Sequence, residues 1–262
     1  MPQIHLRGIQ IHYEDLGAGT PIVLVHGHPF DHTMWNYQVP RFSRSHRLIM
    51  PDLRGYGRSE VVPGRVMMDE MALDMLHLLE ALQIEQVILC GLSMGGQIVL
   101  EFLRLFPYKV NALVIVDSDA RGETTDSRRQ RFEKVDSILR DGMKKHTEDT
   151  IHQYIAPASL SNEPVYTHLY NMMSNTPAEG AVAAHRGRAE RRDHTSFLPA
   201  IKVPTLIVVG EEDFFTPPDI ARLMSDNIPG ARLARIPCAG HLPNMETPEA
   251  FNDILDEFLI AL

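Results

Sequence analysis

A Gly-x-Ser-x-Gly motif at residues 91–95, centred on Ser93, constrains this chain more than any other stretch. Branched apolar residues precede it at 87–89, as in a buried strand, and apolar residues at helical spacing follow it at 98–105. A serine at such a turn holds a strained backbone, so its neighbours must lack side chains where the chain nearly touches itself. The turn lifts the hydroxyl clear of the sheet and sets the next N–H at a helix start, where the helix dipole favours negative charge. The alternative is an ordinary serine in a glycine-rich turn, and the flanking strand and helix favour a nucleophile over it.

The rest of the chain alternates predicted strands with predicted helices. Strands are expected at 9–15, 22–25, 47–50, 87–89, 110–116, 204–210 and 231–236. The first has the alternation of a half-buried antiparallel strand, whereas continuous apolar runs such as 22–25 suit strands that are covered on both faces. Met68, Met71 and Met75 recur at helical spacing, which favours a core-packed helix over a binding surface. The pattern predicts an α/β fold with a mainly parallel sheet and helices on both faces.

The alternation stops between residues 119 and 198, where only helical patterns are found. This segment is predicted to be an all-helical insertion of about four helices that does not fold separately. Its charges balance at twelve Lys/Arg against twelve Asp/Glu, so the net charge of −9 belongs to the rest of the chain. We therefore expect a first core part at 1–118, a helical cap at 119–198 and a second core part at 199–262.

Composition excludes several classes of partner. A net charge of −9 argues against nucleic acid and against anionic membranes. No stretch approaches the roughly 18 consecutive apolar residues of a membrane span, and the N-terminal residues lack a signal-peptide apolar region. Cys90 and Cys238 lie in or beside predicted strands and are expected to be reduced core residues, as in a cytoplasmic protein.

Three chemically capable residues follow predicted strands: Ser93, Asp213 and His241. The carboxyl ends of parallel strands share one edge of a sheet, so we expect these side chains to converge there. Their order along the chain is the one expected for serine hydrolases of the α/β-hydrolase type. In such a triad the histidine takes the serine proton, and the aspartate holds the imidazole in the useful tautomer.

Each assignment has an alternative. Asp213 would also suit a turn or a helix cap. Glu211 and Glu212 are rival candidates for the acid of the triad. Asp213 is favoured because it lies farther from the end of the strand, so that a short loop can turn back towards the histidine. Asp117, at the end of the preceding strand, is a weaker rival that we interpret as a cap for the insertion. His241 is one of thirteen histidines and suits a surface loop, but its place after the last strand favours catalysis.

An oxyanion intermediate would need two N–H donors. Met94 supplies one at the helix start, and the backbone N–H of His28 is the natural second, because Pro29 has none. A metal site is suggested by three nearby histidines, His26, His28 and His32. No set of carboxylates or cysteines with ligand spacing accompanies them, so no metal is expected.

With these residues in place, the chain resembles the α/β-hydrolase superfamily over nearly its whole length. The resemblance is carried by the motifs at 26–29 with Trp35, 51–59, 91–96, 210–213 and 240–241. It implies an eight-stranded α/β-hydrolase fold with a helical cap over the site, no cofactor, and Trp35 as a substrate-binding residue. The stretches 90–96 and 189–193 look most like the 3-oxoadipate enol-lactonase and small carboxylesterase branch. That branch implies a small ester or lactone as substrate, cleaved through an acyl-enzyme.

A basic cluster closes the cap segment: Arg186, Arg188, Arg191 and Arg192. One interpretation is a solvated helix face with acidic neighbours. The other is that one arginine, Arg191 by our prediction, binds a carboxylate of the substrate.

Other functions remain open on the same sequence. C–C bond hydrolysis and perhydrolysis would use the same triad, and a ligand receptor would keep the fold with little turnover. Serine instead of aspartate at position 93 argues against dehalogenase and epoxide-hydrolase chemistry. The sequence gives no oligomeric state.

Overall fold

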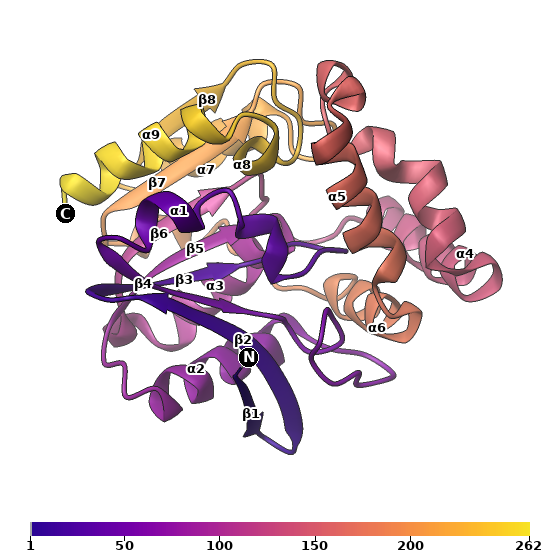
Figure 1. Ribbon diagram of the computed structural model, residues 1–262, viewed down its shortest axis with the longest axis horizontal. Coiled ribbons are helices and arrows are strands. Elements are labelled where there is room, and N and C mark those ends of the chain that lie inside the picture. Colours follow the sequence, from indigo (N-terminus) through magenta and orange to yellow (C-terminus); the bar gives the residue numbers. More distant parts are fainter. Residues whose placement is uncertain (1) are drawn as a thin grey trace.

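A mainly parallel sheet forms the centre of the molecule in a computed structural model, which describes residues 2–262 (Figure 1). Eight strands occur in that range: β1 (Gln3–Leu6), β2 (Ile9–Gly17), β3 (Thr20–Val25), β4 (His46–Pro51), β5 (Val87–Leu92), β6 (Val110–Val116), β7 (Thr205–Gly210) and β8 (Arg232–Ile236). Their order across the sheet is β1-β2-β4-β3-β5-β6-β7-β8. The β1–β2 and β2–β4 pairs are antiparallel and the others are parallel. The predicted sheet is confirmed, and β1 is a strand that the sequence pattern does not reveal.

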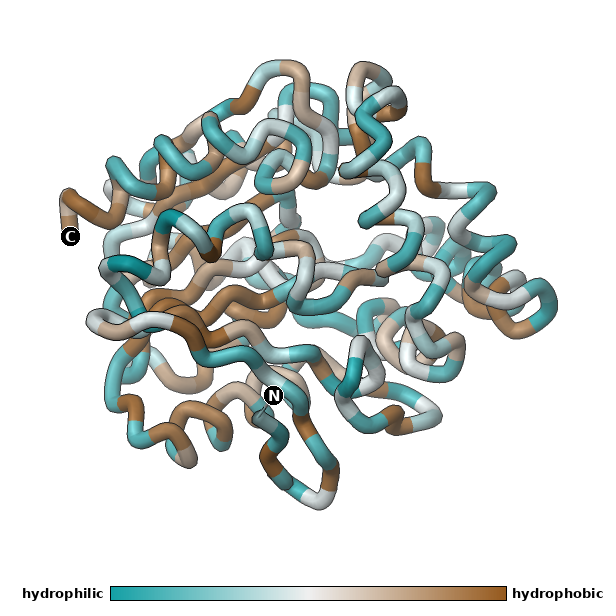
Figure 2. Tube along the Cα trace, viewed as in Figure 1, coloured by the Kyte–Doolittle hydropathy of each residue, from teal (hydrophilic) through white to brown (hydrophobic). Residues whose placement is uncertain are grey.

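Burial follows the apolar patterns of the strands. All residues of β5 and β7 are buried, as expected for strands covered on both faces, and β2 buries its alternating residues Ile9, Ile11 and Tyr13. Figure 2 shows hydrophobic residues concentrated along the central strands. Two hydrophobic clusters result, one on each face of the sheet.

Helices cover both faces of the sheet. One cluster includes residues of α2 (Met68–Ala81), α3 (Met94–Leu105) and α7 (Pro218–Asn227). The other includes residues of α1 (Val39–Phe42), α8 (Pro243–Glu246) and α9 (Pro248–Ile260). Short 3-10 turns occur at η1 (His32–Trp35), η2 (Pro107–Lys109), η3 (Ile151–Gln153), η4 (Pro157–Ser161) and η5 (Leu198–Ala200). The methionine stripe of α2 is buried at Met68, Met71 and Met75, which confirms its predicted core role.

Helices also make up the cap segment. Between Val116 and Thr205 the described residues contain no strand, and the helices there are α4 (Thr125–Thr150), α5 (Glu163–Asn175) and α6 (Ala178–Arg188). The backbone of α4 breaks at Gly142, whose φ is 80°. Helix α4 packs against α5 and α6, and the three lie to one side of the sheet (Figure 1). The boundaries of this cap at 119 and 198 stay a prediction.

Helix α6 lies directly against the loop that precedes α2. The N–H of Val66 donates to the Ala183 carbonyl over 3.0 Å. A Cβ at Gly187 would lie 1.7 Å from the Val66 carbonyl oxygen, so only glycine permits this approach. The packing of α6 at Ala183 and Gly187 against Val66 therefore fixes which face of this helix is turned towards the loop before α2.

The prediction that both cysteines are core residues is confirmed for Cys90 and wrong for Cys238. Cys90 is buried in β5, but Cys238 is exposed, because it follows the end of β8 in a turn with a φ of 56°. Within residues 2–262 no helix is both long enough and apolar enough to cross a membrane.

Candidate active site

Ser93 stands at the turn between β5 and α3, where the motif predicts it. Its φ of 55° and ψ of −114° are unusual for a residue with a side chain. A Cβ at Gly91 would lie 2.3 Å from the Gly95 carbonyl oxygen, so the turn requires glycine there. The backbone of Ser93 is held on both sides, because its N–H donates to the Val116 carbonyl (2.9 Å) and its own carbonyl accepts from the Ser118 hydroxyl (2.7 Å).

His241 and Asp213 form a hydrogen-bonded pair beside this turn. The His241 Nδ1 lies 2.9 Å from the Asp213 Oδ2, although 28 residues separate them in the sequence. Asp213 also accepts the Phe215 N–H over 2.8 Å and the hydroxyl of Thr216. The His241 backbone N–H donates to the Tyr154 carbonyl over 3.1 Å, which ties this loop to the cap segment.

The surroundings of Asp213 favour its charged form. Burial by itself raises the pKa of this carboxyl, but the charge and hydrogen bond of His241 and the hydrogen bond of Thr216 outweigh it, so that the pKa falls to about 2. Asp213 is therefore a carboxylate at neutral pH, which fixes its hydrogen bond as one accepted from the His241 Nδ1–H.

Asp117 lies at the end of β6, next to this pair. Its Oδ1 accepts the Gly210 N–H over 2.9 Å and so bridges β6 to β7, which corrects its predicted role as a cap for the insertion. Burial and the nearby charge of Asp213 raise the pKa of Asp117 well above its ordinary value. Since that shift favours the neutral acid, Asp117 does not compete with Asp213 as the anionic partner of His241.

A cavity of about 190 Å³ brings the parts of the site together. Ser93 and His241 line one side of it, which we call the sheet wall. The part of the lining that lies on the cap helices, which we call the cap wall, is formed by Arg131, Lys134, His185 and Arg188. The two walls come from different parts of the chain, since the sheet wall follows strands and the cap wall lies on α4 and α6.

The family model of the alpha/beta hydrolase fold matches residues 20–248 of this chain. The chain belongs to the α/β-hydrolase family. Its eight-stranded, mainly parallel sheet with covering helices is the fold of that family.

Relatives of this α/β hydrolase include esterases and lactonases. An esterase from Thermogutta terrifontis, solved with malate bound, superposes with a TM-score of 0.95 at 36% identity and covers 99% of this chain and 98% of its own. The AB hydrolase superfamily protein YisY of Bacillus subtilis is 31% identical over 259 residues, 95% of each chain. A 3-oxoadipate enol-lactonase of Acinetobacter baylyi is 29% identical over 233 residues, 88% of this chain and 85% of the relative.

The two predicted oxyanion donors of this α/β hydrolase lie next to the serine turn. Met94 is the first residue of α3, so its N–H has no acceptor within the helix. His28 follows β3 and lines the cavity, and its Nδ1 lies 2.7 Å from the Tyr56 hydroxyl. The use of the two backbone N–H groups as oxyanion donors stays a prediction.

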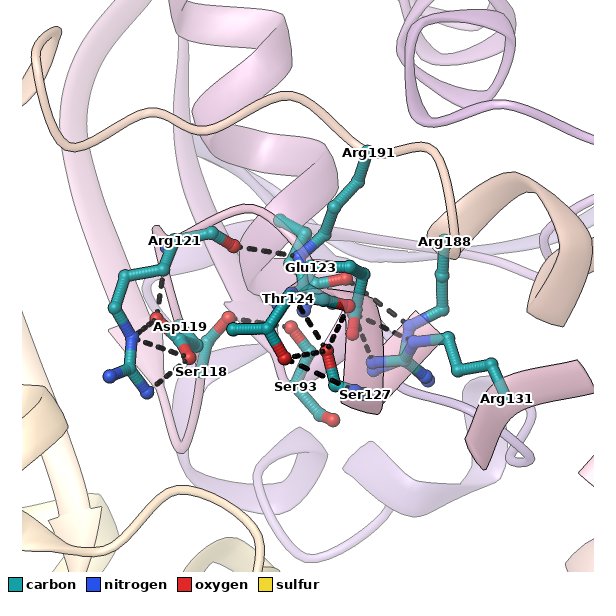
Figure 3. Close-up of polar contacts among 11 residues, drawn as sticks. Ser93, Ser118, Asp119, Arg121, Glu123, Thr124, Ser127, Arg131, Arg188 and Arg191 are labelled. Atoms are coloured by element: carbon teal, nitrogen blue, oxygen red, sulfur yellow. Dashed lines mark hydrogen bonds and ion pairs between the residues drawn. The ribbon is translucent and has the colours of Figure 1, made fainter. Parts of the chain in front are cut away.

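The two predicted substrate-binding residues lie in different surroundings. Trp35 is fully buried in the hydrophobic core against Phe251, with 6.4 Å between ring centroids, and lies outside the cavity lining. The structure thus gives Trp35 no place in the lining of this cavity, because the ring packs in the core against α9, and its predicted substrate-binding role stays a prediction. Arg191 does reach the cavity, but its guanidinium is bound to Glu123 and to the Arg121 carbonyl (2.9 Å), as Figure 3 shows.

Sequence reasoning misses most of the cap wall. Arg188 belongs to the predicted arginine cluster but is not distinguished within it, and Arg131, Lys134 and His185 carry no motif. A signal exists for one pair: His185 and Arg188 are three residues apart, the spacing that puts two side chains on one face of a helix.

The three histidines near the first parallel strand bond to different partners. His26 Nε2 accepts the Leu53 N–H over 2.9 Å, and the His32 Nδ1 lies 2.7 Å from the Asp52 Oδ1. His28 turns instead to Tyr56 and the cavity. Within residues 2–262 these three histidines do not form one group of possible metal ligands. His32 lies instead with Asp31 and Asp52, and the ligand atoms of these three residues are all within 4.8 Å of one another.

Proposed function

We propose that this protein is a serine hydrolase that cleaves a small carboxylic ester or lactone. Ser93 is the nucleophile, His241 the general base and then the general acid, and Asp213 the group that orients the imidazole. The observation that carries the proposal is the bonded pair of His241 and Asp213 on the same cavity as the strained Ser93. The reaction uses these side chains alone, without a cofactor, and the proposal takes the protein to act in the cytoplasm.

The hydrogen bond to Asp213 sets the direction of proton transfer. Because the Nδ1 of His241 donates to this carboxylate, its Nε2 carries the lone pair and accepts the Ser93 proton as the hydroxyl attacks the carbonyl. The imidazolium then gives that proton to the leaving oxygen as the acyl–oxygen bond breaks, which forms the acyl-enzyme. The alcohol of an ester departs at this step, whereas the hydroxyl of an opened lactone stays on the acyl chain. Water attacks the acyl-enzyme with the same histidine as base and releases the acid.

The negative oxygen of each tetrahedral intermediate needs fixed donors. The N–H groups of Met94 and His28 fill this role in the proposal, with the dipole of α3 adding to the first. Losing one such donor costs about a hundredfold to a thousandfold in rate.

The relatives support this reaction class. The esterase and the enol-lactonase among them are both named for cleavage of an acyl–oxygen bond, and each aligns with more than four-fifths of this chain. C–C bond hydrolysis and perhydrolysis use the same triad and are distinguished by substrate panels.

An ester assay tests the proposal. Wild-type protein hydrolyses p-nitrophenyl acetate, and Ser93→Ala lowers kcat by about 10⁵-fold or more, since the triad acts as a unit. Ser225→Ala, which changes an exposed hydroxyl on α7, is the matched control and leaves kcat unchanged. Equal turnover by wild type and Ser93→Ala would contradict the proposal. An absence of turnover across ester chain lengths, with tight binding of a small molecule, would favour the receptor instead.

A further inference from the structure

The inner face of α6 presents two side chains to the cavity. His185 and Arg188 lie one helical turn apart, are only 3% and 9% exposed, and line the same space as Ser93 and His241. A guanidinium is seldom buried in this way without a counter-charge, because the loss of water around a charge is costly.

Arg188 has no such counter-charge. Its Nε donates to the Gln97 Oε1 over 3.2 Å, which leaves the N–H groups of its two terminal nitrogens for other acceptors. Among residues 2–262, no carboxylate forms an ion pair with Arg188. Burial and the neighbouring Arg131 lower the pKa of Arg188 to about 9, so it still carries its charge at neutral pH.

The two carboxylates of the cavity lining, those of Glu123 and Asp119, are already paired with other arginines. The side chain of Glu123 is 4% exposed, and its carboxylate accepts from both Arg131, at 2.6 Å, and Arg191. Figure 3 shows Glu123 held between these two arginines, with the end of Arg188 turned towards the same region. Asp119, the other acidic residue of the lining, is paired with Arg121 at 2.8 Å.

Two further groups make this wall attractive to an anion. The Nζ of Lys134 lies 5.8 Å from the centre of the Phe215 ring, and no carboxylate within residues 2–262 pairs with it. Both ring nitrogens of the buried His185 lack a hydrogen-bond partner among the described residues. Burial holds the pKa of His185 well below its ordinary value, so its ring is a neutral donor. The cap wall therefore offers two uncompensated cations and an unused N–H, but no free carboxylate.

We propose that Arg188 binds a carboxylate on the substrate, so that the preferred substrates are esters or lactones that carry a second, anionic acid group. The two terminal nitrogens of a guanidinium match the two oxygens of a carboxylate in one plane, which a point charge does not. His185 donates to the same carboxylate, and Lys134 adds charge without direct contact. This inference rests on the proposed function, because it puts the anion on the molecule that Ser93 attacks.

Two esters that differ in one group test the inference. We compare p-nitrophenyl hydrogen glutarate with p-nitrophenyl pentanoate, which have equal acyl length but end in a carboxylate and a methyl group. Arg188→Met lowers the ratio of kcat/KM for the acid ester over the neutral ester by about 10- to 100-fold, because a buried charge-assisted contact is lost. Arg188→Lys recovers part of that ratio. Arg186→Met, two residues away with its side chain bonded to the exposed Gly64 carbonyl, is the matched control and leaves the ratio unchanged.

A binding measurement separates this inference from the proposed function. Glutarate binding is followed by calorimetry in Ser93→Ala, and the inference predicts binding that is lost on adding Arg188→Met. If wild type hydrolyses neither ester, the proposed function fails while calorimetry still decides the carboxylate site. Equal loss for both esters in Arg188→Met, or glutarate binding that survives the substitution, would overturn the inference and give Arg188 a structural role.

Discussion

The two walls of the cavity are built in different ways. On the sheet wall, Ser93 and His241 follow strands of one parallel sheet, and backbone geometry fixes their places. On the cap wall, Arg131 and Arg188 lie on separate helices, and helix packing alone brings them together. The comparison teaches that the groups proposed to react in this hydrolase are encoded in short local segments. The groups that would select its substrate depend instead on how distant helices dock.

The largest expected effect is on the sheet wall, at Asp213. Asp213→Asn removes the charge that orients and stabilises the His241 imidazole, so we expect kcat for p-nitrophenyl acetate to fall by about 10³- to 10⁴-fold. The measurement is steady-state hydrolysis at neutral pH, with folding checked by circular dichroism.

Asp117→Asn is the matched control, since it makes the same chemical change at the adjacent strand end. The shifted pKa of Asp117 favours a neutral acid there already, so kcat falls by no more than about threefold. An equal fall of kcat in Asp117→Asn and Asp213→Asn would contradict the different roles assigned to the two carboxyl groups.

The next effect is on the stability of the cap wall. Glu123→Gln leaves the buried guanidinium groups of Arg131 and Arg191 without their shared carboxylate. We expect the free energy of unfolding to fall by about 3 kcal/mol, measured by urea denaturation. Glu190→Gln, whose partners Arg65 and Arg128 are at the surface, is expected to cost less than about 1 kcal/mol. Similar losses of unfolding free energy in the two variants would mean that the ion pairs of Glu123 stabilise the fold no more than the surface pairs of Glu190 do.

The smallest effect concerns pH and stability at Asp117. Its pKa is higher in the folded than in the unfolded chain, so its contribution to stability is complete at low pH and is lost as the pH rises. The amide of an asparagine does not titrate, so we expect Asp117→Asn to gain stability over wild type by about 1 kcal/mol or more between pH 4 and pH 7. Denaturation curves across this range check it. A difference that stays constant with pH would show that Asp117 titrates normally.

Much of the sheet wall could be predicted from the sequence. The Gly-x-Ser-x-Gly motif and the apolar patterns on either side of it predict a strand before Ser93 and a helix after it, and the structure has β5 and α3 in those places. Asp213 and His241 stand out because the end of a buried apolar run marks the sheet edge where parallel strands collect their polar residues. Such signals lie in short stretches of sequence, so they can be recognised before the fold is known.

The cap wall could not be predicted in the same way. Four arginines near the end of α6 are equivalent in the sequence. Arg188 lines the cavity in the structure, where α6 packs closely at Gly187 against the loop before α2. Trp35 shows the opposite case, since its place in the sequence near a functional loop suggests substrate binding, whereas its ring is buried in the core. In both cases the direction of a side chain depends on tertiary packing.

Labelling with a fluorophosphonate, which reacts with activated serine hydroxyls, tests the central claim most directly. Mass spectrometry of digested protein is predicted to find the phosphonyl group on Ser93 in wild type. The same reagent is predicted to leave Ser93 unlabelled in His241→Ala, where no base takes its proton. A label on another residue that abolishes hydrolysis, or full labelling of Ser93 without His241, would contradict the account.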